Sequence, residues 1–186
     1  MIHKHLKLKN MRKIKVYIAA SLDGYIARPD GDLDWLTKYP ITPEINYGYN
    51  EFFDSVDTVI MGGKTYRDIL NMDVIYPYES KTTYVITRNI INSPKDNRYF
   101  ITDNVIDEIS ELKTQQGKDI WLVGGGELIT MMLNANLVDE MQICYVPVIL
   151  GTGILLFPNN PKESTWKLVG SDIYDSGFIK VNYVID

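Results

Sequence analysis

The chain has 186 residues, of which 45% are hydrophobic and 23% are charged, and its formal net charge is −5. This length and composition are typical of one soluble domain with a core of its own, and they exclude a membrane protein because no window offers about 18 consecutive uncharged apolar residues. Residues 21–186 carry 13 positive against 24 negative charges, so the acidic body argues against nucleic acid as a partner.

The first predicted feature is a basic segment at residues 1–11, which we expect to be a flexible tail in front of a single domain at residues 12–186. The stretch IKVYIAASL that follows is too short and too rich in β-branched residues for a secretory signal, so we expect a cytoplasmic protein. The single cysteine, Cys144, lies in the alternating apolar pattern MQICYVPVIL and is predicted to pack in the core. We expect no metal ion.

A strand, a long loop and a helix are predicted next. Residues 13–21 (KIKVYIAAS) have the β-branched character of a strand, and residues 21–40, rich in Gly, Asp and Pro, are predicted to form a loop that carries function. Apolar residues recur at helical spacing through residues 42–56. Thr42 as N-cap and Pro43 as the first helical residue predict that this helix begins there.

Strands and helices then alternate as far as residue 137. Strands are predicted at 57–63, 82–89, 98–101 and 119–125, and helices at 64–70, 104–117 and 126–136. From residue 138 the pattern changes to three strands without a helix between them, at 139–150, 165–176 and 178–186. The sequence therefore predicts an α/β fold with a mainly parallel central sheet and an antiparallel C-terminal edge hairpin.

A run of three glycines, Gly124 to Gly126, joins a buried strand to the first turn of a helix. Bare backbone N–H groups at such a helix start form a site that favours anions, and glycine lets a pyrophosphate or a flat ring approach the main chain. Tight strand-to-helix turns without any ligand also use glycine, and the six-position dinucleotide motif G-x-G-x-x-G is absent. This run alone leaves both interpretations open.

Two further strand ends repeat the pattern. Gly62 and Gly63 end one strand and are followed by Lys64 and Thr65, and a third strand ends in Thr87 and Arg88. Each cation alone could be a surface residue, but ligands of open α/β sheets bind outside the carboxyl ends of the strands. The three strand ends together favour one phosphate-bearing ligand, and an arginine can form a fork with a phosphate monoester.

Six stretches carry a family resemblance: ASLDGYIA, GDLDWL, VIMGGKTY, VITRN, LVGGGEL and VPVILGTGILLF. In this order and spacing they resemble the dihydrofolate reductase-like family, which includes the reductase domain of bacterial riboflavin biosynthesis, over roughly residues 13–185. The resemblance implies a three-layer sandwich with a central sheet between helices, NADPH as hydride donor and a homodimer. It does not identify the substrate.

The resemblance also implies which residues contact NADPH. Thr87 and Arg88 fall near the adenosine 2′-phosphate, and a preference for NADPH over NADH would depend on Arg88 and Lys64. A cis peptide bond is expected between Gly124 and Gly125. By position, the full set of cofactor contacts falls on Ala19, Ile26, Trp35, Gly62, Gly63, Lys64, Thr65, Thr87, Arg88, Gly124, Gly125, Gly126, Glu127, Leu128 and Ile129.

This sequence departs from the family at two positions. The proton-donating carboxylate of dihydrofolate reductase is replaced by Asn46, and Val123 stands where the riboflavin-pathway reductase places a glutamate. Asp34 and Glu51 are the remaining candidates for a proton donor, with Glu44, Asp23 and Asp32 as further alternatives, although such carboxylates commonly cap turns or face solvent. The deaminase domain often fused to that reductase is also not found.

Three hypotheses of function follow, and the second belongs to another class than the first. The first is an NADPH-dependent oxidoreductase that reduces a flat heterocyclic or carbonyl compound, similar to 5-amino-6-(5-phosphoribosylamino)uracil reductase or dihydrofolate reductase. The second is a nucleotide-binding protein that keeps the reductase fold without turnover, because the helix carboxylate is missing. The third, an assembly module that uses its closing strands, predicts no cofactor binding.

Overall fold

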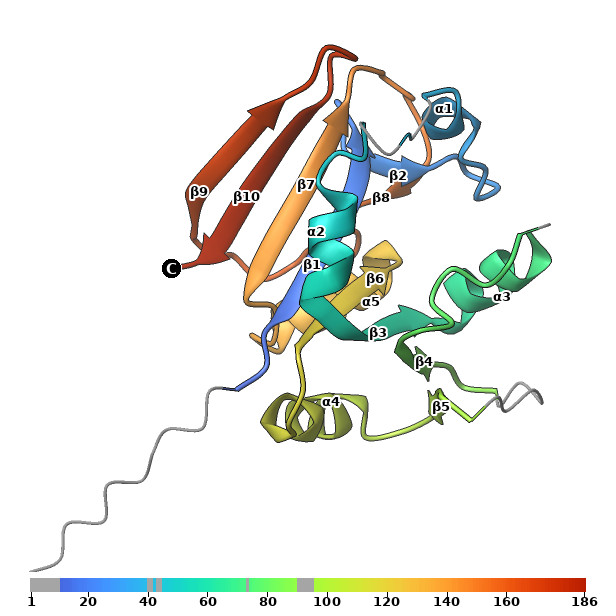
Figure 1. Cartoon of the computed structure of the whole chain (residues 1–186), viewed down its shortest axis with the longest axis vertical. Helices are drawn as coiled ribbons and strands as arrows, with labels where there is room; N and C mark the ends of the chain where they lie inside the picture. The colour runs from blue at the N-terminus through green and yellow to red at the C-terminus, as the bar shows by residue number, and fades with distance from the viewer. Residues whose placement is uncertain (1–10, 40–41, 43–44, 73, 90–95) are drawn as a thin grey trace, which may run out of the picture.

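A computed structural model describes residues 11–39, 42, 45–72, 74–89 and 96–186. Its centre is an eight-stranded sheet with the strand order β5-β4-β3-β6-β1-β7-β10-β9 (Figure 1). The strands of this sheet are β1 (Ile14–Ser21), β3 (Val56–Gly62), β4 (Thr82–Ile86), β5 (Arg98–Ile101), β6 (Asp119–Gly124), β7 (Glu140–Val146), β9 (Trp166–Ile173) and β10 (Ile179–Ile185).

The direction of the strands confirms the predicted sheet. Strands β5, β4, β3, β6, β1 and β7 pair in parallel, whereas β10 pairs antiparallel with both β7 and β9. Because the parallel strands are joined through helices, their carboxyl ends meet at one edge of the sheet. The antiparallel hairpin β9–β10 closes the other side of the molecule, as the change of pattern after residue 138 predicts.

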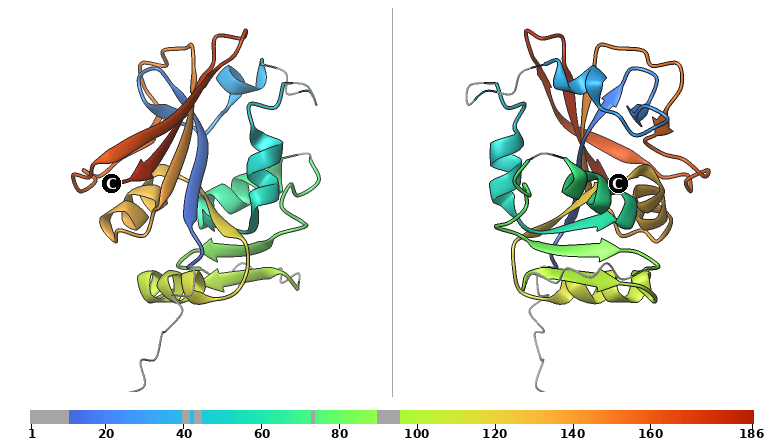
Figure 2. Two further views of the ribbon diagram at one scale, coloured as in Figure 1. Left: turned by 60° about the vertical axis from the view of Figure 1, so that its left-hand side comes forward. Right: turned by 90° about the vertical axis from the view of Figure 1, so that its right-hand side faces the viewer.

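Helices cover both faces of the sheet and give three layers (Figure 2). Helices α2 (Tyr49–Ser55) and α3 (Gly63–Asn71) pack on one face, where Phe52 and Tyr66 join a core cluster with Trp121. Helices α4 (Val105–Thr114) and α5 (Gly126–Asn134) pack on the other face, where Ile109 and Ile129 belong to the largest cluster. The expected sandwich is therefore present.

The burial of consecutive residues explains why the central strands read as continuous apolar runs. In β3, Val59, Ile60 and Met61 are all fully buried, because one face meets α2 and α3 and the other meets α4 and α5. Cys144 is also buried, on β7 in a third cluster with Trp35 and Phe178, which confirms its predicted packing role.

The predicted helix at residues 42–56 is wrong at its start, because α2 begins only at Tyr49. Tyr47 and Gly48 both have left-handed backbone angles, with φ of 56° and 81°, and such residues cannot continue a right-handed helix. The Asn46 Oδ1 accepts a hydrogen bond from Gly48 N at 2.9 Å and holds this turn. The Thr42 hydroxyl accepts a hydrogen bond from Ile45 N, as a cap would, but no helix begins there, and Pro43 lies outside the described residues.

The loop predicted at residues 21–40 contains two short elements. Strand β2 (Tyr25–Ala27) pairs antiparallel with β8 (Ile154–Leu155), and a single helical turn, α1 (Asp34–Thr37), follows it. Asp23 ties the loop to the segment after β7, because its carboxylate accepts hydrogen bonds from Leu150 N and Gly151 N. No helix among the described residues is long and apolar enough to cross a bilayer.

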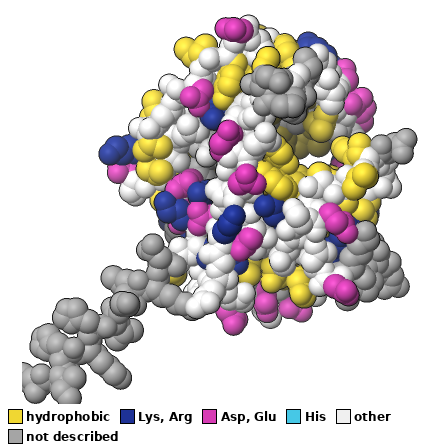
Figure 3. Space-filling model, in the orientation of Figure 1, with side chains coloured by type: hydrophobic (Ala, Val, Ile, Leu, Met, Phe, Trp, Pro, Cys, Tyr) yellow, Lys and Arg dark blue, Asp and Glu magenta, His cyan; other side chains and the backbone are white. Residues whose placement is uncertain are grey.

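The surface of the face that carries α2 shows acidic and basic side chains interspersed (Figure 3). Between α2 and α3, below α1, this surface is hollowed, and hydrophobic side chains border the hollow. The hollow lies on the side of the sheet toward which the carboxyl ends of the parallel strands point (Figure 1).

Candidate cofactor site

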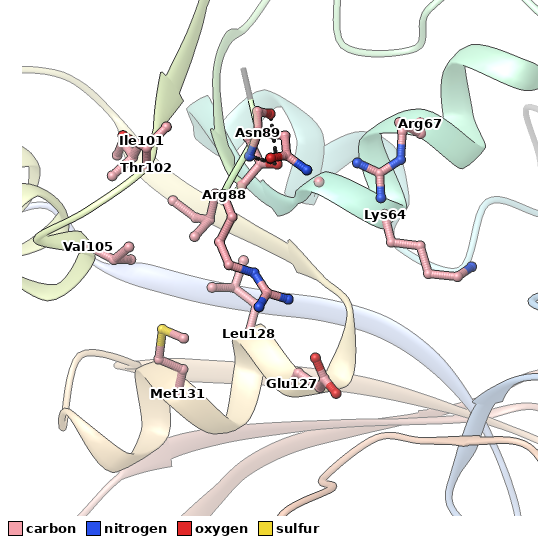
Figure 4. Close-up of a pocket in the computed structure, with 13 residues that line it drawn as sticks. Lys64, Arg67, Arg88, Asn89, Ile101, Thr102, Val105, Glu127, Leu128 and Met131 are labelled. Carbon is pink, nitrogen blue, oxygen red and sulfur yellow. Dashed lines mark hydrogen bonds between the residues drawn. The ribbon is translucent and has the colours of Figure 1, made fainter. Parts of the chain in front are cut away.

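A groove lies at the carboxyl edge of the parallel strands, between α3, the end of β4 and the start of α5 (Figure 4). Its volume is about 490 Å³, within the range of pockets that hold small molecules. Polar and charged side chains line one part of it and apolar ones line the rest. The lining residues are Gly63, Lys64, Arg67, Ile86, Thr87, Arg88, Asn89, Ile101, Thr102, Val105, Glu127, Leu128 and Met131.

The structure therefore brings together six of the residues predicted from the three strand ends. Gly63 and Lys64 come from the start of α3, Thr87 and Arg88 follow β4, and Glu127 and Leu128 come from the first turn of α5. This convergence follows from the topology, because β4, β3 and β6 are neighbours in the parallel sheet.

Two helices begin at this groove without a side-chain cap. Helices α3 and α5 each start at a glycine, and neither has a side-chain hydrogen bond at its N-cap, which is Gly62 in α3 and Gly125 in α5. The first backbone N–H groups of a helix have no partner within the helix, and the helix dipole makes them attract negative charge. Two such ends at one groove suit a ligand with several phosphate oxygens.

The glycines at these junctions fall into two groups. A Cβ atom on Gly63 would lie 2.7 Å from Thr87 Oγ1, and one on Gly126 would lie 2.2 Å from the Leu155 carbonyl oxygen, so both positions need glycine for packing. A Cβ on Gly125 would meet only Thr65 Oγ1, at 3.7 Å, which is an ordinary contact. The bare backbone at Gly125 is therefore not required by packing and leaves room for a ligand.

Gly124 and Gly125 are joined by a cis peptide bond, which confirms the prediction made from the family resemblance. Gly124 also has φ of +117°, a region that side chains other than glycine rarely adopt. Its carbonyl oxygen lies 3.8 Å from the Cβ position of Gly62, so the ends of β3 and β6 lie side by side.

The remaining predicted cofactor residues lie in different surroundings. Ala19 and Trp35 belong to the cluster under α1, and Ile26 packs against the largest core cluster. Ile129 is completely buried in the core, and its side chain packs beneath Gly124 of the glycine turn. The Trp35 Nε1 atom is buried and has no hydrogen-bond partner among the described residues, so a donor is left for a bound molecule.

Neither candidate proton donor lines the groove. Asp34 is exposed and forms an ion pair with Arg28 at 2.5 Å, and the hydrogen bond from Arg28 lowers the pKa of the Asp34 carboxyl below its usual value. An ionised carboxylate of this kind is a poor proton donor at neutral pH. Glu51 is exposed on α2 and lines a separate groove over β7, β10 and β9, together with Gln142 and Lys180.

Several groove residues were not predicted from the sequence. They are Arg67, Asn89, Thr102 and an apolar set made of Ile86, Ile101, Val105 and Met131. Helical spacing could have identified Arg67, because it lies three residues after Lys64 and side chains at that spacing share a helix face. The apolar set comes from four different elements, and only the fold brings it together.

The model of the RibD C-terminal domain family matches residues 12–180 of this chain. Among curated proteins, the uncharacterized protein YwjB of Bacillus subtilis (strain 168) is 36% identical over 173 residues, which cover 93% of this chain and 98% of YwjB. The match therefore covers almost the full length of both proteins.

Solved structures give the same result for the fold. A putative riboflavin biosynthesis protein from Shewanella sp. PV-4 superimposes with a TM-score of 0.84 at 28% identity, and the match covers 94% of this chain and 99% of that one. A dihydrofolate reductase from Enterococcus faecalis, solved in complex with NADP(H) and RAB-propyl, gives a TM-score of 0.64 at 14% identity over 94% and 96% of the two chains. At that identity the second match supports the shared fold alone.

Proposed function

The chain belongs to the RibD C-terminal domain family, a family of reductases with the dihydrofolate reductase-like fold, and on this premise we propose that it is an NADPH-dependent oxidoreductase. The observation that carries the proposal is the meeting of two uncapped helix starts, at Gly63 and Gly126, with basic side chains at one groove. The phosphates of a dinucleotide are the ligand that this arrangement suits best.

The residues present fit such a cofactor. The bare backbone at Gly125 leaves space beside the glycine turn, and the buried Trp35 Nε1 lacks a partner among the described residues. When bound, NADPH supplies a hydride to an electrophilic carbon of the substrate. The amides of the first turns of α3 and α5 would hold its phosphates, and the apolar set of Ile86, Ile101, Val105 and Met131 would border its adenine.

We place the substrate in the hollow between α2 and α3 (Figure 3). Hydrophobic side chains border this hollow, and they favour a flat ring over a strongly hydrated group. A heterocyclic or carbonyl compound fits this description. The family and the neighbouring structures support a reductase, while the nature of the border supports the flat substrate.

Titration with reduced and oxidised pyridine nucleotides tests the proposal directly. We expect saturable binding of NADPH to the purified protein, measured by calorimetry, and faster oxidation of NADPH in the presence of a suitable pterin, aminopyrimidine or carbonyl compound. A folded protein, verified by circular dichroism, that binds neither NADPH nor NADP⁺ would contradict the proposal.

A second candidate is a nucleotide-binding protein without turnover. One observation favours it: Asn46, three residues before α2, stands where dihydrofolate reductase has its carboxylate, and its side chain holds the turn at Gly48. Asp34 is tied to Arg28, and Glu51 lines a different groove. NADPH binding that persists without oxidation across a broad panel of compounds would support this candidate and exclude the first.

We further propose that the protein forms a homodimer through the face of the β9–β10 hairpin on which Leu168 and Ile173 are exposed. In register, Leu168 pairs with Tyr183 and Ile173 pairs with Ile179, so these side chains point to the same face of the sheet. Leu168 is 52% exposed and Ile173 is 82% exposed. An uncharged apolar strip of this kind on a sheet edge is self-complementary, and a second copy can cover it.

Replacing Ile173 with lysine tests the dimer. A charge at this end of the strip should raise the dissociation constant of the dimer, which analytical ultracentrifugation measures. Lys167→Ala, on the same strand but on the opposite face, is the matched control. A wild-type protein that is monomeric at high concentration would contradict the dimer.

A further inference from the structure

We propose that Arg67 and Arg88 together form a two-sided clamp for a phosphomonoester dianion, the 2′-phosphate of NADPH, and that Arg67 rather than Lys64 sets the preference for NADPH over NADH. This inference rests on the proposed function, because it assigns part of the same groove. It replaces the pair expected from the sequence, which was Arg88 with Lys64.

Arg67 lies where an anion at the start of α3 would be held. Its side chain folds back along the helix, so that Nη1 is 3.3 Å from the Cβ position of Gly63. Thr87 Oγ1 is 2.7 Å from the same point, so the Arg67 guanidinium and the end of β4 converge on the first turn of α3. The guanidinium therefore lies beside the uncapped amides of this helix.

Arg88 approaches the groove from the other side. It follows β4, and Figure 4 shows its side chain extending toward Leu128 and Glu127 at the start of α5. In the same view the Arg67 side chain points from α3 into the groove. Among the described residues neither arginine forms an ion pair with a carboxylate, so both keep their donors for a ligand.

Lys64 already has a carboxylate partner outside the groove. Its ammonium forms an ion pair with Asp68, one turn further along α3, at 2.7 Å. The same nitrogen lies 3.0 Å from the Cβ position of Gly31, on the loop that follows β2. In Figure 4 the Lys64 side chain runs away from Arg88. Lys64 therefore faces the loop of residues 28–33 and not the space between the two arginines.

The chemistry of the ligand also suits two cations. A phosphomonoester carries close to two negative charges at neutral pH and three acceptor oxygens, and arginine offers a planar fork of donors that matches them. NADH has a hydroxyl at this position, which gains little from a second guanidinium. Glu127, on the far lip of the groove, adds a negative charge that Arg88 must offset before an anion binds.

Binding measurements on single variants test the clamp without relying on turnover. We compare Arg67→Ala, Arg67→Lys, Arg88→Ala and Lys64→Ala by calorimetric titration with NADPH, NADH and the fragment 2′,5′-ADP at fixed ionic strength. Lys167→Ala, an exposed change on β9, is the control for the general loss of a positive charge. Circular dichroism checks that each variant is folded.

Arg67→Ala should raise the dissociation constants of NADPH and 2′,5′-ADP at least about tenfold, because a charge-assisted hydrogen bond is lost, while that of NADH changes less than about threefold. Arg67→Lys should give an intermediate loss, and Lys64→Ala should leave the ratio of NADPH to NADH affinity near the wild-type value. An unchanged ratio in Arg67→Ala, with wild-type binding of NADPH, overturns the clamp alone. Wild-type protein that binds no nucleotide overturns the proposed function as well.

Discussion

Replacing Gly126 with alanine should destabilise the fold, whereas the same replacement at Gly125 should leave the fold intact and weaken nucleotide binding. A methyl group at position 126 would lie 2.2 Å from the Leu155 carbonyl oxygen and 2.9 Å from Pro158 Cδ. At position 125 its nearest neighbour would be Thr65 Oγ1, at 3.7 Å. Replacements at these two adjacent glycines therefore test packing and ligand binding separately.

The expected magnitudes follow from these distances. Because the neighbour at position 126 is backbone and cannot rotate away, the start of α5 must move, and we expect a loss of roughly 3 kcal/mol, the upper end of overpacking changes. For a chain of this size that loss lowers the melting temperature by about 6–12 °C. Gly125→Ala should change the free energy of unfolding by no more than about 1 kcal/mol, because the added methyl group meets an ordinary contact.

Urea unfolding followed by circular dichroism measures the stability of both variants, and calorimetric titration with NADPH measures binding by Gly125→Ala. We expect Gly125→Ala to remain folded and to bind NADPH at least about tenfold more weakly, since a methyl group would occupy space beside the glycine turn. Equal losses of stability in the two variants would refute the steric reasoning. Wild-type affinity in Gly125→Ala would refute the assignment of that space to a ligand.

Three further predictions concern single residues. Burial opposes ionisation of Asp119, but its hydrogen bonds with Lys15 and Lys13 N lower its pKa below 3.8. The unfolded chain therefore takes up the proton first, and the free energy of unfolding should fall as the pH drops from about 5 through 3.8. Asp119→Asn should flatten this dependence in urea titrations. Burial raises the pKa of the Cys144 thiol to about 11, so iodoacetamide at pH about 8 should label it only after unfolding, and rapid labelling of folded protein would contradict its burial. Thr130→Val should cost about 1 kcal/mol of unfolding free energy, because the buried Thr130 hydroxyl donates to the Pro158 carbonyl at 2.9 Å; an unchanged urea midpoint would show that this bond contributes nothing.

The order of elements could be predicted because each buried strand carries its own signal. The runs around Val59 and Leu122 are apolar over both faces, which marks central strands of a parallel sheet, and the alternating pattern after residue 138 marks the antiparallel edge. The start of α2 could not be predicted in this way. Thr42 is a good cap by residue type, but the left-handed turn at Tyr47 and Gly48 depends on packing of Tyr47 against Phe178, far along the chain.

The backbone of the candidate site could be predicted from the sequence, but some of its side chains could not. Glycines at strand ends are visible in sequence, since few other residues serve a tight strand-to-helix turn. The partner of a cation cannot be read from the sequence: Lys64 stands directly after Gly63, yet its ammonium forms an ion pair with Asp68 and lies beside the loop at Gly31. Arg67, without a carboxylate partner among the described residues, takes the position toward the groove.

The same reasoning explains why the glycine run at residues 124–126 left two interpretations open. Gly126 is needed because the carbonyl of Leu155 approaches the helix start, Gly124 is needed for its backbone angle, and Gly125 has neither requirement. A turn selected for packing alone would tolerate a side chain at Gly125, and that position faces Thr65 at the start of α3. The Cβ position of Gly125 meets no other heavy atom of the described residues within 4 Å, and the cofactor that we propose to span both helix starts would account for a glycine there.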